Sequence, residues 1–291
     1  MSGSIISARG AQQLVNALMI NTTLLRLNLS LNVLDDDGAR SFAKLLKANK
    51  ALTALNLAAN DIGNPGATSL AGSLQMNTTL QVLDLSLNPS IGNSGVNSLC
   101  EALKVNRTLT QLNLSGNGVG DAGIRSLCAV LKNNTSLTFL ALSDVTISAY
   151  TVRAVAEVLR VNSTLNRLDF LGNKVSESML AGVESIADAL KVNGTLTNLN
   201  LSTNVIDDSG IQSLSEALKA NATLINLDIS NNGIQTSGAR SFTERHFRDK
   251  IAGPGCQALF EAGFPNFSAV PQIAFQDFYS ESMNMTHQNT S

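Results

Sequence analysis

The stretch LTQLNLSGNGV at residues 109–119 is one copy of a phrase that recurs along most of the chain. Most copies place leucine at the first, fourth and sixth positions and asparagine at the ninth. The aligned copies begin at residues 24, 52, 80, 109, 137, 165, 196 and 224, with steps of 28, 28, 29, 28, 28, 31 and 28 residues. A fixed period of this size indicates a solenoid, in which each repeat packs against its neighbours.

Each copy is followed by a helical phrase, such as GIQSLSEALKAN at residues 210–221. In the leucine phrase, Leu112 and Leu114 point the same way because side chains alternate along a strand. In the helical phrase at 95–106, Val96, Leu99 and Leu103 recur at three- and four-residue spacing and form an apolar stripe. Every repeat is therefore predicted to be one short strand and one helix, whose apolar faces bury each other.

The spacing of these elements predicts the fold class. Strands pair about 4.8 Å apart, whereas packed helices lie roughly 8–10 Å apart, so the helix side must spread more than the strand side. We therefore expect an α/β fold, a right-handed horseshoe with a parallel sheet on its concave wall and helices on its convex wall.

Polar residues mark the start of the predicted helices. An Asp or Asn stands two residues before a glycine in several copies, where a short polar side chain can cap free backbone N–H groups. We expect these residues to act as helix caps; they are Asp36, Asn64, Asn93, Asp121 and Asp208.

The ends of the array depart from the repeat. Residues 1–23 supply a helix without its strand and are expected to form an N-terminal half-repeat cap. Residues 24–250 hold the eight repeats, residues 251–278 abandon the pattern as a C-terminal cap should, and the polar residues 279–291 are expected to be a disordered tail.

Composition argues against several functional classes. A net charge of −2 and an isoelectric point near 5.7 give no basic face for nucleic acid. No segment approaches the roughly 20 apolar residues of a membrane helix, and no signal peptide opens the chain, so we expect a cytoplasmic protein that does not enter membranes. Three cysteines cannot form a disulfide framework, and His246 and His287 have no ligand cluster around them. No metal and no cofactor are expected.

The period and the full helix in each repeat resemble the ribonuclease-inhibitor-like leucine-rich-repeat family, which includes repeat regions of NOD-like receptors, Ran GTPase-activating proteins and bacterial effectors. In that family, the asparagine at the ninth position bonds the backbone of the neighbouring loop. The resemblance assigns this role to Asn32, Asn60, Asn88, Asn117, Asn173, Asn204 and Asn232. The fifth copy departs from the pattern twice, with Val145 in place of the asparagine and Thr151 in place of the helix-start glycine.

An enzyme is not expected. A paired-carboxylate mechanism needs two acids within about 5–10 Å, whereas Asp84 and Asp169 face the sheet surface three repeats apart, hence about 14 Å. The alternative is a GTPase-activating protein of the Ran type. Those proteins carry an acidic stretch after the repeats, and residues 264–291 of this chain do not.

The outward-facing residues of the concave wall are the best functional candidates, because they vary between copies that otherwise repeat. We expect a protein partner to bind there, centred on Phe139 and Arg167, since aromatic and guanidinium groups anchor protein interfaces. Such a chain is expected to act as a monomeric, non-catalytic scaffold, with an effector or sensor-like protein as one form of it and a helix-side interface as the alternative. The candidate partner-binding residues are Arg26, Val82, Gln111, Phe139, Arg167 and Asp169.

Overall fold

The computed structural model describes residues 1–173 and 180–235, in which helices and short strands alternate. The helices are α1 Ala8–Leu18, α2 Asp35–Ala48, α3 Asn64–Leu74, α4 Asn93–Val105, α5 Asp121–Leu131, α6 Ala149–Val161, α7 Leu180–Leu190 and α8 Asp208–Ala220. The strands are β1 Arg26–Asn28, β2 Ala54–Asn56, β3 Val82–Asp84, β4 Gln111–Asn113, β5 Phe139–Ala141, β6 Arg167–Asp169, β7 Asn198–Asn200 and β8 Asn226–Asp228.

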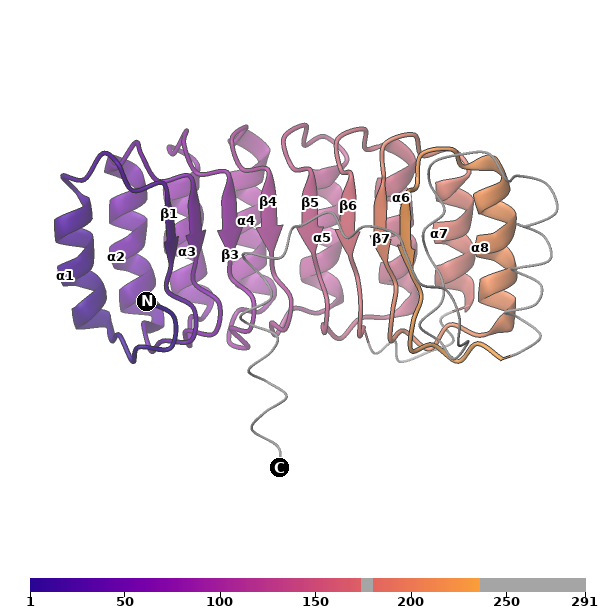
Figure 1. Ribbon diagram of the computed structural model, residues 1–291, viewed down its shortest axis with the longest axis horizontal. Coiled ribbons are helices and arrows are strands. Elements are labelled where there is room, and N and C mark those ends of the chain that lie inside the picture. The colour runs from indigo at the N-terminus through magenta and orange to yellow at the C-terminus, as the bar shows by residue number, and fades with distance from the viewer. Residues whose placement is uncertain (174–179, 236–291) are drawn as a thin grey trace, which may run out of the picture. The chain divides into compact units, whose positions relative to one another are not determined.

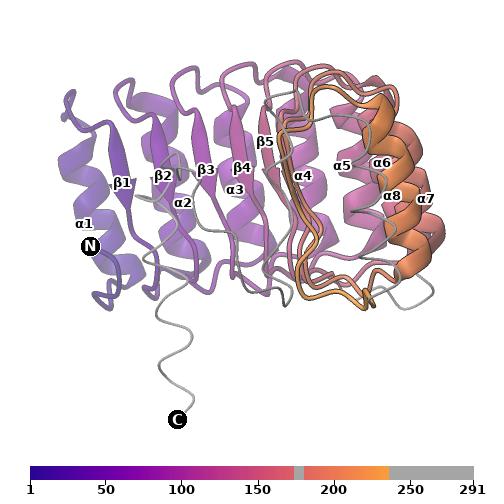
Figure 2. The same cartoon turned by 45° about the vertical axis from the view of Figure 1, so that its right-hand side comes forward.

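The strands form one open parallel sheet in the order β1 to β8. Neighbouring strands pair at equivalent positions of the repeat, so that Leu83 lies beside Leu112 and Leu112 beside Leu140. Figure 1 shows the strands in front and the helices in a single layer behind them, and Figure 2 shows the same two layers from the side. The predicted α/β solenoid, with its sheet on one wall and helices on the other, is confirmed.

The core lies between the two layers. Leu112 and Leu114 are buried from the strand side, and Val96, Leu99 and Leu103 are buried from the helix side, as their spacing predicted. Each fully buried aliphatic side chain stabilises the fold by about 1.5–3 kcal/mol relative to its exposed state. The core is therefore a continuous series of small aliphatic contacts rather than one central cluster.

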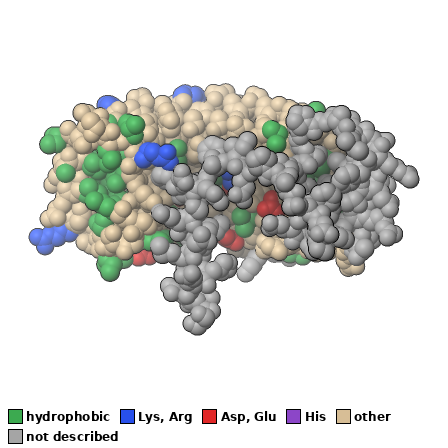
Figure 3. Space-filling view, in the orientation of Figure 1, with side chains coloured by type: hydrophobic (Ala, Val, Ile, Leu, Met, Phe, Trp, Pro, Cys, Tyr) green, Lys and Arg blue, Asp and Glu red, His purple; other side chains and the backbone are tan. Residues whose placement is uncertain are grey.

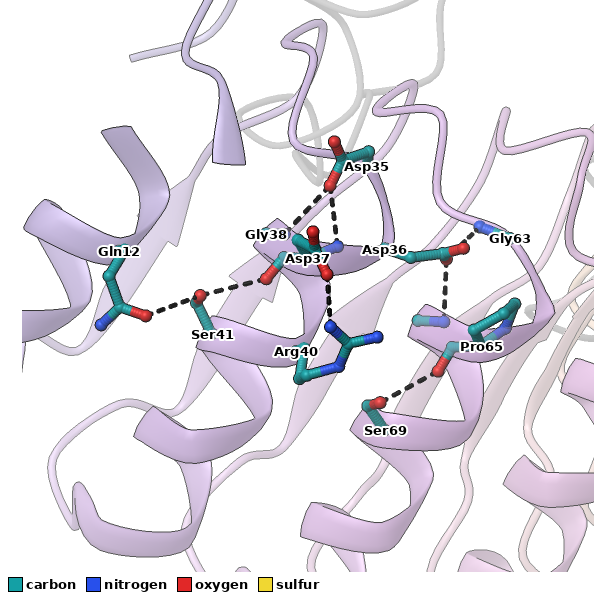
Figure 4. A network of polar contacts seen from close by, with 11 residues as sticks. Gln12, Asp35, Asp36, Asp37, Gly38, Arg40, Ser41, Gly63, Pro65 and Ser69 are labelled. Carbon is teal, nitrogen blue, oxygen red and sulfur yellow. Dashed lines mark hydrogen bonds and ion pairs between the residues drawn. The ribbon is translucent and has the colours of Figure 1, made fainter. Parts of the chain in front are cut away.

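The polar residues at the helix starts accept hydrogen bonds from free helix-start amides, as predicted, but the amides belong to the following helix and not to their own. Oδ1 of Asp36, in α2, accepts hydrogen bonds from the amides of Gly63 and Gly66 at the start of α3, each at 2.8 Å (Figure 4). The equivalent bonds run from α3 to α4, from α4 to α5 and from α5 to α6; the acceptors are Asn64, Asn93 and Asp121. Because the solenoid places one helix start beside the next, each side chain reaches the following repeat more readily than its own.

Helices α2 and α8 are capped by an acid of their own repeat, because the preceding repeat has no polar residue at the capping position. Ala8 and Leu180 occupy the equivalent position in α1 and α7, and neither side chain can accept a hydrogen bond. At the start of α8, Asp207 Oδ1 accepts from the amide of Gly210 at 2.9 Å, and at the start of α2 Asp35 accepts from the amide of Asp37 at 2.7 Å. A local acid therefore replaces the cap that the preceding repeat does not supply.

Some predicted segments fall outside this description. The described residues belong to the first of two units into which the chain divides, Met1–Leu259 and Phe260–Ser291. The predicted C-terminal cap at 251–278 and tail at 279–291 lie outside the described residues. Among the described helices, none is both long enough and apolar enough to cross a membrane.

Candidate functional site on the concave face

The strand register aligns the outward-facing residues into two rows across the sheet. The first row is Arg26, Ala54, Val82, Gln111, Phe139, Arg167, Asn198 and Asn226. The second row is Asn28, Asn56, Asp84, Asn113, Ala141, Asp169, Asn200 and Asp228.

Most residues of the second row hydrogen-bond the backbone of the turn that follows their own strand. Asn28 Oδ1 accepts from the amide of Ser30 at 2.9 Å, and the same bond two residues on is made by Asn56, Asp84, Asn113, Asn200 and Asp228. A short acceptor side chain that bonds its own backbone two residues later stabilises a turn. These residues therefore have a structural role at the point where each strand ends.

Asp169 is the exception among the acids and amides of this row. Its carboxylate accepts two hydrogen bonds from Arg167, at 3.0 Å from Nε and 2.8 Å from Nη2. Residues two apart on a strand share a face, which allows this bidentate pair. The Arg167 guanidinium also lies over the Phe139 ring, with Cζ 4.9 Å from the ring centroid.

We call Phe139, Arg167 and Asp169 the β5–β6 cluster. Phe139 is only 7% exposed, so its ring offers little surface of its own to a partner. The Arg167 side chain is 43% exposed and that of Asp169 is 17% exposed. The cluster thus presents mainly an arginine, with an aromatic ring beneath it and a carboxylate beside it.

The other candidates lie farther from the cluster. Gln111 and Val82 are half-buried on β4 and β3, in the same row as Phe139. Arg26 is exposed on β1, at the edge of the sheet. The structure therefore brings three of the six candidates into direct contact, aligns two beside them, and leaves Arg26 four strands away from Phe139.

Asp84 is a buried acid on β3. Its carboxylate accepts from the hydroxyl of Ser86 at 2.6 Å and from the amide of Ser86 at 2.9 Å. Burial raises the pKa of Asp84, and the hydrogen bonds from Ser86 and Asn113 oppose that rise only in part. Two strands separate it from Asp169, so the sheet does not pair these carboxylates.

The asparagines at the ninth position of the leucine phrase, which we call the asparagine ladder, lie in the loops that follow the strands. Asn88 Nδ2 donates to the Leu57 carbonyl of the preceding repeat at 3.1 Å, and its Oδ1 accepts from the amides of Asn60 and Ile62 at 3.0 Å. Each of the others also donates to a carbonyl of the preceding turn; they are Asn32, Asn60, Asn117, Asn173, Asn204 and Asn232. Val145 can make neither bond.

The two described cysteines are buried on neighbouring helices, Cys100 on α4 and Cys128 on α5. Burial raises the pKa of each thiol to about 12. A thiol with such a pKa is protonated at neutral pH and is therefore a poor nucleophile and a poor metal ligand. Across residues 1–173 and 180–235, no group of three or more His, Cys, Asp or Glu residues is placed to hold a metal ion.

One exposed aromatic residue was missed from the sequence. Tyr150, in the first turn of α6, is 67% exposed. It stands directly before Thr151 in the irregular fifth copy, where other copies carry Asp37, Pro65, Ser94 or Ala122. That substitution is the signal from which it could have been found.

Comparison with known proteins identifies the repeat. A sequence family described as "Leucine Rich repeat" matches residues 21–43, 48–71, 77–100, 105–128, 192–215 and 220–242. The stretch between 128 and 192, which holds the irregular fifth copy and the 31-residue step, is not matched. Among curated proteins, none matches the chain.

Solved structures that are partly similar to the chain include the following two. The first is described as actin-binding site 2 of leiomodin-1, with 24% identity, 54% of this chain and 88% of that chain covered, and a TM-score of 0.46. The second is the tropomodulin C-terminal domain of Caenorhabditis elegans, with 17% identity, 53% and 92% covered, and a TM-score of 0.45.

Proposed function

Because this chain is a leucine-rich-repeat protein, we propose that it is a non-catalytic scaffold that binds a protein partner on its concave face, through the first row and the β5–β6 cluster. The other candidate contacts are Arg26, Val82 and Gln111. The cytosol is the proposed compartment, with a host cell's cytosol as the variant for an effector or sensor-like protein.

The observation that carries this proposal is the arrangement of Arg167. Its guanidinium is held by two hydrogen bonds to Asp169 and lies over the ring of Phe139, yet the side chain stays 43% exposed. Binding normally costs about 0.5–1.5 kcal/mol for each flexible side chain that is immobilised. An arginine already held in one orientation avoids most of that cost, and arginine is enriched at the centres of protein interfaces.

Variation along the first row supports the same surface. The row presents cationic, apolar, amide and aromatic side chains on successive strands, whereas the second row is mostly Asn and Asp bound to its own turns. Residues that do not bond their own turns can differ between repeats without loss of stability. A concave wall of this kind fits the extended binding surfaces that solenoids use.

Site-specific crosslinking tests which wall binds. A photoreactive amino acid at Gln111 on β4 is compared with one at Ala129, an exposed position on α5 of the same repeat. We expect the same partner protein to crosslink from Gln111 and not from Ala129. Crosslinking from Ala129 alone would move the interface to the helix wall and refute the proposal.

Substitution then tests the cluster with the partner so identified. We expect Arg167→Ala to weaken binding by at least about tenfold, since truncation of an interface anchor costs roughly 2 kcal/mol or more. Tyr150→Ala, an exposed aromatic on the helix side, is the matched control and should leave the affinity unchanged. Equal losses in both variants would contradict a concave interface.

The Ran-type alternative has its own test. Adding the protein to a panel of small GTPases is expected to leave their rate of GTP hydrolysis unchanged. Acceleration of any one of them would replace the scaffold proposal with the GTPase-activating one.

A further inference from the structure

The turns that lead from each helix into the next strand carry a charge pattern of their own. These turns, with the last residues of some helices, are residues 19–25, 47–53, 75–81, 104–110, 132–138, 160–166, 191–197 and 219–225. They contain no Asp or Glu. They contain eight exposed cations, which are Lys47, Lys50, Lys104, Arg107, Lys132, Arg160, Lys191 and Lys219. The strand arrows in Figure 1 point downward, so these turns form the upper edge of the solenoid, which we call the helix-end edge. Figure 3 shows Lys and Arg side chains at this edge.

The opposite edge, where the helices begin, has the reverse charge. The loops at residues 30–37, 58–65, 86–94, 115–122, 143–150 and 202–209 contain no Lys or Arg. They contain eight acids, which are Asp35, Asp36, Asp37, Asp61, Asp121, Asp144, Asp207 and Asp208. The net charge of −2 therefore conceals a basic edge and an acidic edge.

Helix dipoles explain only part of this separation. Cations at helix ends and acids at helix starts both interact favourably with the dipole. Lys50 and Arg107, however, lie beyond the asparagines that end α2 and α4. Four of the eight cations pair with an acid one turn earlier; they are Lys104, Arg160, Lys191 and Lys219. The other four form no ion pair within the described part of the chain; they are Lys47, Lys50, Arg107 and Lys132.

Apolar side chains stand beside these cations. In four of the turns an aliphatic residue directly precedes the asparagine that ends the helix, and its side chain is 58–65% exposed; the four are Met76, Val105, Val161 and Val192. In three of the four turns the residue before it is one of the eight cations. Exposed aliphatic surface costs free energy in water, and this cost recurs at one position of the repeat. The helix-end edge is therefore both basic and apolar.

The turns hold these side chains outward. Asn106 Nδ2 donates to the Leu74 carbonyl of the preceding repeat at 2.7 Å, and its Oδ1 accepts from the amide of Leu109 at 2.8 Å. The asparagine is buried, whereas its neighbours Val105 and Arg107 are exposed. The same asparagine donates to a carbonyl of the preceding repeat in other turns; these residues are Asn49, Asn77, Asn134, Asn162, Asn193 and Asn221. A rigid backbone thus presents the cations and the aliphatic side chains.

The helix-end edge can meet a flat surface along its whole length. The described helices lie side by side, and Figures 1 and 2 show their upper ends at about one level. A flat surface that touches one turn can therefore touch the turns of the other repeats as well. A protein partner would instead need a complementary surface that follows several successive repeats.

The chemistry of the edge favours a lipid surface over the other anionic surfaces. Cations bind anionic headgroups by charge, and apolar side chains beside them enter the boundary between headgroups and acyl chains. A nucleic acid would gain nothing from the aliphatic side chains, and the eight turns contain no aromatic residue on which bases could stack. A second copy would have to offer its acidic edge, where Asp36, Asp121 and Asp207 already accept from backbone amides at helix starts.

We propose that the helix-end edge binds the surface of a membrane that contains anionic phospholipids. The cations lie against the headgroups, and Met76, Val105, Val161 and Val192 lie at headgroup depth. This binding needs no helix that spans the membrane, and the cytoplasmic leaflet carries lipids of this charge. The edge is separate from the β5–β6 cluster, so the concave face stays open to a protein partner while the edge is occupied.

Sedimentation with lipid vesicles tests the proposal on the full chain. The chain is mixed with vesicles of phosphatidylcholine alone or of phosphatidylcholine with phosphatidylserine. We expect it to sediment with the phosphatidylserine vesicles at low salt, to stay in solution with phosphatidylcholine alone, and to be released by added salt. Absence of binding to phosphatidylserine would overturn the proposal. Binding of an oligothymidine strand by a chain that ignores both vesicles would assign the edge to nucleic acid instead.

A pair of double variants locates the contact. Lys50→Gln with Lys132→Gln removes two cations from the helix-end edge. Arg125→Gln with Arg153→Gln removes the same charge from exposed positions nearer the other edge. Each cation near an anionic membrane contributes about fivefold to affinity, so the first pair should weaken vesicle binding about thirtyfold. The second pair should change it little, because Arg125 lies about 10 Å farther along α5 than Lys132, roughly one Debye length. Equal losses would refute this edge as the contact.

A fluorescent reporter tests the apolar part of the contact. The chain has no tryptophan, so Val161→Trp and Tyr150→Trp each place a single reporter at opposite ends of α6. Phosphatidylserine vesicles should shift the emission of the Val161→Trp variant to the blue and leave that of the Tyr150→Trp variant unchanged. Equal shifts, or none, would contradict the proposed orientation. Blue emission from the Val161→Trp variant before vesicles are added would mean that protein already covers the edge, and would overturn the assignment to lipid.

Discussion

The carboxylate of Asp36 holds the amide of Gly66, one repeat later, at 2.8 Å. The first N–H groups of a helix have no partner within the helix, and a carboxylate placed there also interacts favourably with the helix dipole. The contact is close, because a Cβ on Gly66 would lie 2.6 Å from that same Oδ1. Glycine at this position therefore lets the cap from the preceding repeat approach.

The first prediction concerns this cap. Asp36→Ala should lower the free energy of unfolding by about 1–2 kcal/mol, because the amides of Gly63 and Gly66 lose their acceptor. Asp36→Asn should be nearly neutral, since Asn64 caps the next helix in the same way. The midpoint of urea unfolding measures both. Equal losses for the two variants would mean that charge, rather than the acceptor oxygen, is what matters.

The second prediction concerns Asp84. Burial raises its pKa in the folded state, so the folded protein bears an unfavourable term when this carboxyl ionises. The resulting loss of stability begins as pH rises through the unfolded pKa near 3.8, and it is complete once the pH exceeds the folded pKa. Asp84→Asn, which copies Asn200 and its bonds to Ser202, should therefore stabilise the protein at pH 7 and have less effect at pH 3.

Unfolding free energies of the wild type and Asp84→Asn at the two pH values check this sign. A gain that is the same at pH 3 and pH 7 would show that packing, and not ionisation, separates the two side chains. A loss at pH 7 would contradict the prediction directly.

The third prediction compares two positions of the asparagine ladder. Asn88→Val should destabilise the protein by about 2–3 kcal/mol, because the buried Leu57 carbonyl and the amides of Asn60 and Ile62 lose their partner. Val145→Asn restores the side chain that can reach the loop of the preceding repeat and should cost less than about 1 kcal/mol. Thermal and urea unfolding measure both variants. A greater loss at 145 than at 88 would refute the ladder as a source of stability.

The fourth prediction concerns the core beneath the irregular copy. A small cavity lined only by apolar side chains lies between α5, α6, β5 and β6, and Val155 is part of its wall. Val155→Ile should fill part of it and raise the free energy of unfolding by about 0.5–1 kcal/mol. Val152→Ile, one turn earlier on the same helix and fully buried outside the cavity, should destabilise by about 1 kcal/mol or more through overpacking. If both variants lose stability, the cavity cannot accept a methylene group.

Local pattern was enough to predict much of the structure. The leucines of the phrase and the stripe formed by Val96, Leu99 and Leu103 required two alternating elements, and the constant period required that the elements stack. The outward-facing rows followed directly, because the register between equal repeats has only one consistent alignment. Val145 and Thr151 already marked the fifth copy as irregular.

Side-chain contacts between repeats could not be predicted from the local sequence in the same way. Asp36 and Gly66 are 30 residues apart, and nothing in the local sequence of either says which helix start the carboxylate reaches. The bidentate pair of Arg167 with Asp169 competes with the turn bond that other members of the second row make, and only the three-dimensional arrangement decides that competition.

By itself, the sequence determined the repeat, the layer to which each side chain belongs and the alignment of the rows, because all three follow from periods of two, 3.6 and about 28 residues. The tertiary structure alone decided which repeat caps which helix and that Phe139 lies buried beneath an arginine. Those features depend on distances between repeats, and the period fixes the order of the repeats but not what their side chains meet.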